Sequence, residues 1–466
     1  MKPLLLFASI LWLSATLVLA SQTLADAPPN IILVLSDDQG WNALSTPMDP
    51  QEPRSGSDFH QTPNLDRLCK EGMRFTQAYS SGSQCMPTRN SILFGVSTTK
   101  SRMWENGSKP DQRLFDDPEQ TLPQVIKNAK GTFTYKTAHF GKWHIKERTP
   151  EQCGYDESDG PTDNKDGSLP EQTKDPKAVN GITSRAIDFM KRQHEAGNPF
   201  YVQLSHYATH VEFLATPDME SKYDQREAGE RHKNRIFAAM NEDLDRGVGK
   251  LLDAIDAMGI GDNTYVFYTS DNGYPNAFVP QGARHHGAWP LSYHKTLCYE
   301  GGVRVPLIVR GPGIRANAVS NVPIVTHDLM RTFAELVGSS ALALEQSDGG
   351  SFASVLKNEG IGKVARAEDF LVFHGKRGDT SIRRDNLKLM FDEKGNLVGL
   401  FNLANDPSEE RDVSKEHPEA TIVLTRTLRN YFEKCQFDKR IRKLNVGGKK
   451  PLEAIDSGCL EALLSN

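Results

Sequence analysis

The chain contains little cysteine, no excess of basic charge and, after its first twenty residues, no apolar run long enough to cross a bilayer. Its six cysteines are scattered over 466 residues, which excludes a small scaffold held together by disulfides. The formal net charge of −5 argues against a broad basic surface for nucleic acid. We therefore expect a protein that binds no nucleic acid, is not an integral membrane protein, and builds any anion site from local residues.

The first residues have the composition of an export signal. Lys2 precedes an apolar run that ends in small residues at Ala20, and an Ala-Asp-Ala triplet ends at Ala27. The run is short for a membrane anchor, which is the alternative interpretation, and its flanks suit cleavage. We expect a signal peptide over residues 1–20, or 1–27, and a protein that is exported to the periplasm or secreted.

Buried strands and amphipathic helices alternate along most of the chain. Apolar runs of strand length occupy residues 31–38, 200–206, 264–273 and 304–313. Between the second and third runs, apolar residues at steps of three and four extend from Ile236 to Ile255 and predict a long helix. The Asp- and Lys-rich stretch 156–177 is expected to be an exposed loop. The alternation predicts an α/β fold with a large, mainly parallel sheet flanked by helices.

The pattern changes near residue 365. Short apolar segments separated by turn signals follow, a Lys-Gly-Asn turn at 394–396 suggests a hairpin, and a helix is expected over about 415–435. The length of the chain exceeds that of one ordinary domain. We therefore predict a large α/β domain over residues 28–364 and a smaller C-terminal α+β subdomain with an antiparallel sheet over residues 365–466.

Polar residues follow three of the predicted strands at the point where each strand ends. They are Asp37 and Asp38 after the first strand, His206 and His210 after the second, and Asp271 and Asn272 after the third. Ligand sites in open α/β sheets lie beyond the carboxyl ends of the strands. One such aspartate is commonly a cap or turn residue, but three strands together indicate a site. Carboxylate and amide oxygens favour a hard divalent cation, Ca²⁺ or Mg²⁺, over zinc.

One cysteine stands in the polar stretch SQCMPTRNSILFG, residues 83–95. Pro87 suits the first turn of a helix, which places Cys85 just ahead of a helix N-terminus, where backbone N–H groups attract anions. Arg89, one turn later, can point to the same place. A buried structural cysteine is the alternative for this stretch taken alone.

Two further segments carry groups that can hold the oxygens of an anion or transfer protons. Lys142 and His144 lie in FGKWHI, in the loop expected after a strand around YKTAHF. Lys295 precedes TLCYEGGVRVP, and taken alone it has the simpler interpretation of a solvated surface residue.

Together these segments resemble the type I sulfatases of the alkaline phosphatase superfamily. The resemblance rests on Cys-x-Pro-Thr-Arg at 85–89, followed by Ile-Leu-x-Gly, and on further segments in the family's order. Those segments are PNIILVLSDDQGW, TPNLDRLCKEGMRFTQAYS, TAHFGKWHI, LDRGVGKLLDAIDAMGIGDNTYVFYTSDNG, KTLCYEGGVRVPLIVRGPG and LFNLANDPSEERDV. A collinear set of this kind, which spans most of the chain, is far more specific than one motif.

The resemblance implies a sulfuric ester hydrolase that removes sulfate from a sulfated carbohydrate or a related ester. It makes Cys85 the precursor of formylglycine, which a separate maturation enzyme produces by oxidation. The implied calcium ligands are Asp37, Asp38, Asp271 and Asn272, together with the modified Cys85. The implied polar groups around the sulfate are Arg89, Lys142, His144, His210 and Lys295.

The sequence departs from the family pattern at three places. Phe94 stands where threonine is usual, Val211 and Glu212 follow His210 where x-Pro is frequent, and Lys146 follows GKWHI where glycine is common. The first change is expected to concern packing, and the other two are expected near the rim of the pocket. Candidate sugar contacts are Trp104, His285, His286 and Trp289.

Two other functions share parts of this pattern, because one scaffold can serve several chemistries. A phosphomonoesterase or phosphodiesterase would be favoured by two metals with extra His and Asp ligands. The single-metal set with Lys142, His144 and Lys295 favours sulfate instead. A non-catalytic glycan-binding protein would need no formylglycine, and the intact set of polar residues argues against it.

Overall fold

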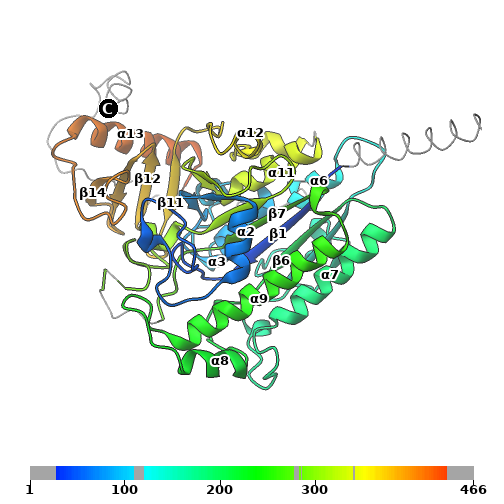
Figure 1. Cartoon of the computed structure of the whole chain (residues 1–466). Coiled ribbons are helices and arrows are strands. Elements are labelled where there is room, and N and C mark those ends of the chain that lie inside the picture. Colours follow the sequence, from blue (N-terminus) through cyan, green and yellow to red (C-terminus); the bar gives the residue numbers. More distant parts are fainter. Residues whose placement is uncertain (1–27, 110–119, 278–282, 285, 340–341, 438–466) are drawn as a thin grey trace, which may run out of the picture.

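The computed structural model describes residues 28–109, 120–277, 283–284, 286–339 and 342–437. They form an α/β structure with one large sheet between helices and a separate antiparallel sheet beside it (Figure 1). This confirms the predicted fold class. The predicted signal peptide lies outside the described residues, and within them no helix is both long and apolar enough to cross a membrane.

The large sheet has eight strands. Counted from one edge of the sheet, the first five strands run parallel to one another. In that order the strands are β5 (Glu157–Ser158), β4 (Lys136–Gly141), β6 (Phe200–Ser205), β1 (Asn30–Ser36), β7 (Thr264–Ser270), β8 (Leu307–Arg310), β2 (Met73–Phe75) and β9 (Ala318–Ser320). Strand β8 is antiparallel to both β7 and β2, and β2 pairs in parallel with β9. The sheet is therefore mainly parallel, as predicted.

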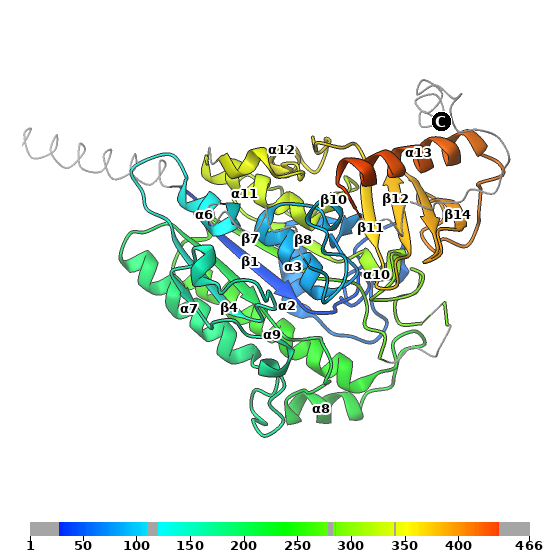
Figure 2. The same ribbon diagram turned by 180° about the vertical axis from the view of Figure 1, so that it is seen from behind.

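Helices cover both faces of this sheet (Figures 1 and 2). Those packed on one face are α2 (Pro63–Glu71), α7 (Val179–Glu195) and α9 (Arg235–Ala257), while the other face carries α3 (Cys85–Phe94), α6 (Leu122–Lys127), α11 (Leu329–Val337) and α12 (Ala353–Lys357). An apolar core lies on each face of the sheet, and alternate residues of β1 pack into one core or the other, because side chains alternate across a strand. Leu33 packs with α3 and α11, whereas Val34 packs with α7 and α9.

The predicted long helix is α9, and the structure confirms it. The carbonyl oxygen of the Asn234 side chain accepts a hydrogen bond from the N–H of Phe237 at 2.9 Å, which caps the first turn. Its apolar stripe, which includes Val248 and Leu252, is buried against the sheet and α7. The short helix α8 (Pro217–Asp224) packs near the beginning of α9.

The smaller sheet is antiparallel and consists of β11 (Leu371–His374), β12 (Thr380–Arg384), β13 (Leu387–Phe391) and β14 (Leu397–Asn402). Helix α13 (Pro418–Lys434) covers it, with Leu424 and Leu428 against Ile382 and Leu389. The predicted hairpin is the β13–β14 turn, where the Asp392 carboxylate accepts hydrogen bonds from backbone N–H groups. The division of the chain into domains at residues 364 and 365 stays a prediction.

A buried group of charges, which we call the interface cluster, joins the two sheets. It consists of Glu300, at the start of α10 (Glu300–Val303), Lys388 on β13, and Glu409. Lys388 Nζ lies 2.9 Å from Glu300 Oε1 and 2.8 Å from Glu409 Oε1. Tyr79 donates a hydrogen bond of 2.7 Å to Glu300 Oε2, and the Glu300 N–H donates one of 2.9 Å to Glu409 Oε2. Every carboxylate oxygen of the cluster therefore has a donor or a cation beside it.

The prediction of an exposed loop over 156–177 is wrong at both ends of that stretch. Residues 157–158 form β5 at the edge of the large sheet, and the backbone N–H of Asp156 donates to the Thr137 carbonyl on β4. At the other end, Lys177 is only 2% exposed. The high charge of the stretch indicated solvent, but pairing with a sheet edge and contact with a neighbouring loop depend on residues that are distant in sequence.

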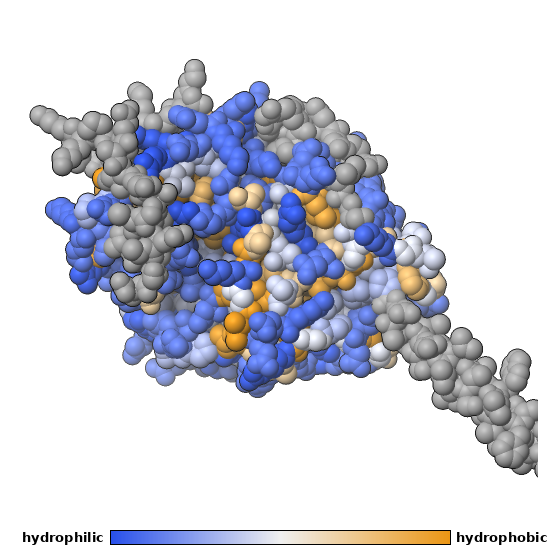
Figure 3. All heavy atoms as spheres, turned by 90° about the horizontal axis from the view of Figure 1, so that it is seen from above, coloured by the Kyte–Doolittle hydropathy of each residue, from blue (hydrophilic) through white to orange (hydrophobic). Residues whose placement is uncertain are grey.

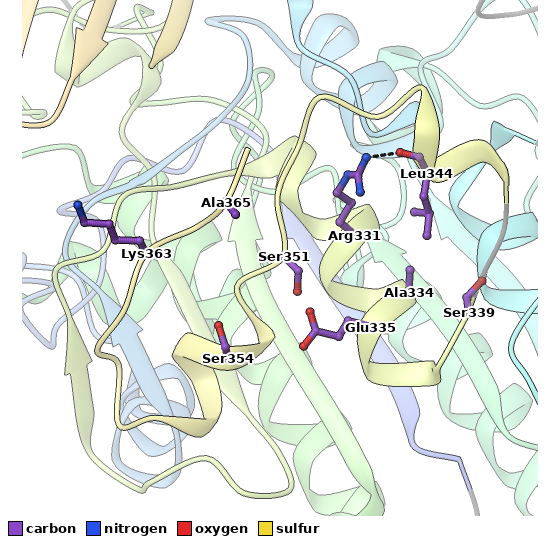
Figure 4. A pocket seen from close by; sticks show the side chains of 9 residues that line it. All are labelled: Arg331, Ala334, Glu335, Ser339, Leu344, Ser351, Ser354, Lys363 and Ala365. Atoms are coloured by element: carbon purple, nitrogen blue, oxygen red, sulfur yellow. Dashed lines mark hydrogen bonds between the residues drawn. The ribbon is translucent and has the colours of Figure 1, made fainter. Parts of the chain in front are cut away.

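The surface seen from above carries apolar side chains in separate patches among hydrophilic ones (Figure 3). A cavity of about 510 Å³ lies between α11 and α12 (Figure 4), and its lining includes Arg331, Glu335, Ser354 and Lys363. In the close view Arg331 points to Leu344 and donates a hydrogen bond to its carbonyl oxygen. None of the predicted site residues lines this cavity, so the predicted chemistry belongs elsewhere.

Candidate active site

The predicted site residues come together at the carboxyl ends of the parallel strands. Asp37 follows β1, Lys142 follows β4, His210 lies five residues beyond β6, and Asp271 follows β7. The side chains lie in direct contact there: Lys142 forms an ion pair with Asp37, and Arg89 Nη2 lies 2.7 Å from Asp271 Oδ2. Four separate strands therefore deliver these groups to one edge, which is where open α/β sheets bind ligands.

Cys85 is the first residue of α3, one position further into the helix than expected. Every residue of α3 is buried, so the surrounding core fixes the helix N-terminus. Cys85 Sγ lies 3.7 Å from Lys295 Nζ and 3.9 Å from Asn106 Nδ2. A buried structural cysteine was the alternative interpretation, and Cys85 is indeed buried. Its sulfur, however, faces the Lys295 ammonium and not apolar side chains alone.

Backbone contacts explain why Lys295 lies beside Cys85. The N–H of Thr296 donates to the Ser83 carbonyl at 2.8 Å, which ties the two segments together. The antiparallel sheet supports both segments: Ser83 Oγ donates to the His374 carbonyl at 2.8 Å, and the Lys376 N–H donates to the Thr296 carbonyl at 2.7 Å. Residues of the smaller sheet thus help to hold the segments that carry Cys85 and Lys295.

Three carboxylates alternate with three cations at the site. Besides the Lys142 and Arg89 pairs, Lys295 Nζ lies 2.6 and 2.8 Å from the two oxygens of Asp38. Asn272 Nδ2 donates to Asp38 Oδ1 at 2.7 Å, and His210 Nε2 lies 4.0 Å from Asp38 Oδ2. All of these side chains are largely buried, so their charges act on one another with little screening by water.

The oxygens of this cluster fit a hard cation. Asp37 Oδ1 and Asn272 Oδ1 are buried without a hydrogen-bond partner, which is costly unless a ligand supplies one. One candidate ligand atom from each of Asp37, Asp38, Cys85 and His210 lies within 4.8 Å of the others. The carboxylate and amide oxygens of the cluster suit Ca²⁺ or Mg²⁺, whereas the sulfur of Cys85 and the ring nitrogen of His210 are softer ligands.

The buried charges shift the acid–base properties of the site. Burial acts to raise the pKa of Asp37, but Lys142 and the other cations nearby hold that pKa well below its usual value. Burial and the negative charge of Asp37 raise the pKa of Asp271 to about 6. Burial and then Lys142 lower the pKa of His144 to about 2, so its imidazole is neutral near pH 7. Burial also lowers the pKa of His210.

Residues 29–339 match the family model described as Sulfatase. The chain belongs to the sulfatase family. A sulfatase of Formosa agariphila is 28% identical over 90% of this chain and 91% of that protein. The N-acetylgalactosamine-6-sulfatase of Mus musculus is 31% identical over 71% of this chain and 66% of that enzyme. The chain is accordingly a sulfatase enzyme.

A solved structure shares the fold of this sulfatase. Ps i-CgsB, solved in complex with k-i-k-neocarrahexaose, superposes with a TM-score of 0.71 over 90% of this chain and 94% of that one, at 24% identity. At this level of identity, the superposition shows that the two proteins share a fold.

Several predicted contacts of the sulfatase are occupied by other interactions. His206 is buried and faces Gly247 of α9, away from the carboxylates. The rings of Trp104 and Phe437 pack edge to face at 5.0 Å, so Trp104 helps to attach the C-terminal part of the described chain. The guanidinium of Arg54 lies 4.3 Å from the centroid of the Trp289 ring. The His286 ring packs against Tyr274 and His294, and His285 lies outside the described residues.

Sequence reasoning missed two groups at the site. Asn106 accepts a hydrogen bond from the Met86 N–H at 3.2 Å while its amide nitrogen faces Cys85 Sγ. Lys177 is buried, and the charges of Asp37 and Asp38 act on it. Neither residue belongs to a periodic pattern or a motif, and only the folded loops bring them to the sheet edge.

Proposed function

We propose that this sulfatase removes sulfate from sulfated carbohydrates, through a formylglycine hydrate made from Cys85 and a bound divalent cation, Ca²⁺ or Mg²⁺. The observation that carries the proposal is the position of Cys85 at a helix N-terminus, 3.7 Å from Lys295 Nζ and within the cluster of metal-binding side chains. A carbohydrate substrate is supported by the names of the relatives, an N-acetylgalactosamine-6-sulfatase and a protein solved with a neocarrahexaose.

Asp37, Asp38, Asp271 and Asn272, with the modified Cys85, would hold the cation. When bound, the cation supplies positive charge that favours deprotonation of a nearby hydroxyl. Asp37 is kept in its ionised form by the surrounding cations, so it is ready to bind a metal ion. The unpartnered oxygens of Asp37 and Asn272 give that ion two coordination positions that no other described group occupies.

The formylglycine hydrate supplies one hydroxyl that attacks sulfur and a second hydroxyl whose deprotonation later releases sulfate. Arg89, Lys142 and Lys295 offset the negative charge on the sulfuryl oxygens as the bond to the sugar oxygen breaks. Their ion pairs with buried carboxylates hold these three cations in place before substrate arrives. Such preorganised groups need no reorganisation during the reaction.

Two histidines would divide the proton transfers. His210, 4.0 Å from Asp38, is assigned the proton that the departing sugar oxygen receives when the sulfur–oxygen bond breaks, assisted by Lys295. His144 has a buried Nδ1 without a partner and a neutral ring, so it is assigned the proton lost by the second hydroxyl. The sulfate then leaves and the aldehyde forms again, which water rehydrates.

Formylglycine also implies partners and a route through the cell. A separate maturation enzyme must read the segment around Cys85 and oxidise it, so that enzyme belongs to the proposal. The composition of residues 1–20 supports export, with the periplasm or the extracellular space as the working location.

A phosphate ester hydrolase remains the competing enzyme. Within the described residues, the one cluster of at least three potential metal ligands contains Asp37, Asp38, Cys85 and His210. A second metal position with its own His and Asp ligands, which would favour phosphate, is not found in that part of the chain. This favours sulfate esters as substrates.

Mass spectrometry of the peptide that contains Cys85 tests the mechanism directly. Protein produced with a maturation enzyme should carry formylglycine at residue 85, and desulfation of a panel of sulfated glycans should scale with the modified fraction. The Cys85→Ala variant serves as the unreactive control. Full activity with unmodified Cys85, or faster cleavage of matched phosphate esters than of sulfate esters, would contradict the proposal.

A further inference from the structure

The segment that carries His210 comes to the surface directly after this residue. Before His210, its backbone is bonded to that of Asp37: the Asp37 N–H donates to the Ala208 carbonyl at 3.0 Å, and the Thr209 N–H donates to the Asp37 carbonyl at 2.6 Å. After His210, the chain returns to the core at Phe213, whose ring packs against Phe237, and at Ala215, which is buried. The exposed residues between are Val211, which is 38% exposed, and Glu212.

Lys177 provides a contact in this gap. Its ammonium donates a hydrogen bond of 3.2 Å to the carbonyl oxygen of Glu212, two residues after His210. On the other side of Glu212, the His210 ring contacts the carbonyl oxygen of Val211. Lys177 therefore ties the exposed residues Val211 and Glu212 to a different part of the fold.

Burial of this lysine calls for a reason, because lysine is almost never fully buried unless it is paired. Lys177 is 2% exposed, and no carboxylate lies within ion-pair distance of it among the described residues. The negative charges of Asp37 and Asp38 act on it at longer range. A structural role alone would be served better by an apolar side chain of the same length, since an unpaired buried charge is costly.

We propose that Lys177 is a positioning residue that fixes the segment after His210, and so aims the His210 imidazole at the departing sugar oxygen. The inference rests on the proposed role of His210. Lys177 itself does not touch the reacting atoms; it acts through the Glu212 carbonyl. Displacing a catalytic group by about 1 Å can cost about 10²-fold in rate, so one hydrogen bond near the acid has a measurable effect.

The test uses Lys177→Met, which keeps the length of the side chain and removes the donor. Lys174→Met, an exposed lysine of the same loop, is the matched control. Single-turnover rates are measured on a sugar sulfate, whose leaving oxygen needs a proton, and on nitrophenyl sulfate, which hardly needs one. We expect a loss of about 10- to 100-fold on the sugar sulfate and little change on nitrophenyl sulfate or in either KM.

Two further variants make the result specific. Lys177→Arg keeps a charged donor and should recover part of the lost rate. Lys177→Met added to His210→Ala should cost nothing further, because the two residues act on one step. Equal losses on both substrates, a KM effect alone, or a full additional loss in the double variant would overturn the inference. Failure of the proposed function looks different: Cys85→Ala would then stay active whatever Lys177 does.

Discussion

Two buried clusters of charge in this molecule differ in what they leave unpaired. In the interface cluster, Lys388 lies between Glu300 and Glu409, and all four carboxylate oxygens have a donor or cation beside them. Glu409 Oε1 has no hydrogen bond but lies 2.8 Å from the Lys388 ammonium, whereas Asp37 Oδ1 and Asn272 Oδ1, at the edge of the large sheet, are buried without a hydrogen-bond partner. Because an unsatisfied buried oxygen is costly, it persists where a ligand or ion completes it. Burial and charge alone therefore do not mark an active site; at the sheet edge the unsatisfied oxygens coincide with a group of potential metal ligands.

The two clusters are nevertheless connected. The Ser292 hydroxyl donates to the Ser408 carbonyl, next to Glu409, and Lys295 lies in the same segment as Ser292. The Cys298 N–H donates to Asp379 Oδ2 at 2.9 Å, which attaches that segment to the smaller sheet as well. The segment that contains Lys295 is thus attached to residues beside the interface cluster and to the smaller sheet.

The largest expected effect belongs to the reacting residue of the sheet-edge cluster. Cys85→Ala should abolish nearly all turnover, by at least about 10⁴-fold, because the nucleophile is lost, while the melting temperature changes little. Turnover of a sulfate ester and thermal unfolding are measured on the same preparation. Near-normal activity of this variant would refute the proposed mechanism.

His210→Ala should slow a sugar sulfate by about 10²–10⁴-fold, the usual range for general acid catalysis. A nitrophenyl sulfate, whose leaving oxygen needs little protonation, should be slowed much less. The ratio of single-turnover rates on the two substrates measures the difference. An equal loss on both would mean that His210 only positions the sulfate, and Lys295 would become the better candidate for the acid.

Lys388→Met should affect stability rather than chemistry. Removing this cation leaves Glu300 and Glu409 buried without their counter-ion, which typically costs about 3–5 kcal/mol in the free energy of unfolding. Urea unfolding measures the loss, and Lys394→Met in the exposed β13–β14 turn is the control. Turnover per folded molecule should fall far less than in Cys85→Ala. A large loss of turnover without destabilisation would contradict the assignment of a purely structural role to Lys388.

The interface cluster should also respond to pH. Burial, with the negative charge of Glu300 nearby, raises the pKa of Glu409 to about 7 from the ordinary value of 4.5. A raised carboxyl pKa contributes stability that is present below pH 4.5 and is lost as the pH rises through about 7. The free energy of unfolding should therefore fall over this range by at most about 3 kcal/mol from this group. In Glu409→Gln that part of the slope should vanish; an unchanged slope would exclude Glu409 as its source.

Metal removal should act on the sheet-edge cluster alone. Chelation should lower both turnover and the melting temperature, and added Ca²⁺ should restore both. A ligand present at 100 times its Kd stabilises the folded state by about 2.7 kcal/mol. The Lys388→Met variant should show the same shift on chelation, since its cluster binds no ion. If chelation changes neither rate nor melting temperature, the assignment of Asp37 and Asn272 as metal ligands is wrong.

Sequence reasoning found the parts of the fold that depend on local pattern. The strands before Asp37 and Asp271 are continuous apolar runs, and the helix from Arg235 to Ala257 repeats its apolar residues at helical spacing. Where contacts come from distant residues, the prediction failed. Trp104 was predicted as a possible sugar contact, but its ring packs against Phe437. The charged stretch 156–177 was predicted as an exposed loop, but it contains an edge strand and the buried Lys177.

By itself, the sequence determined the class of fold, the order of the strands along the chain and the chemical types at their carboxyl ends, because these follow from periodicity and from residue identity. Only the tertiary structure decided which of those groups meet. It brought Lys295 to Cys85 and Lys177 to the His210 segment, and it turned His206 away. The loop that carries Lys177 has no periodic pattern in the sequence. The contact of the Lys177 ammonium with the Glu212 carbonyl is therefore fixed by packing alone.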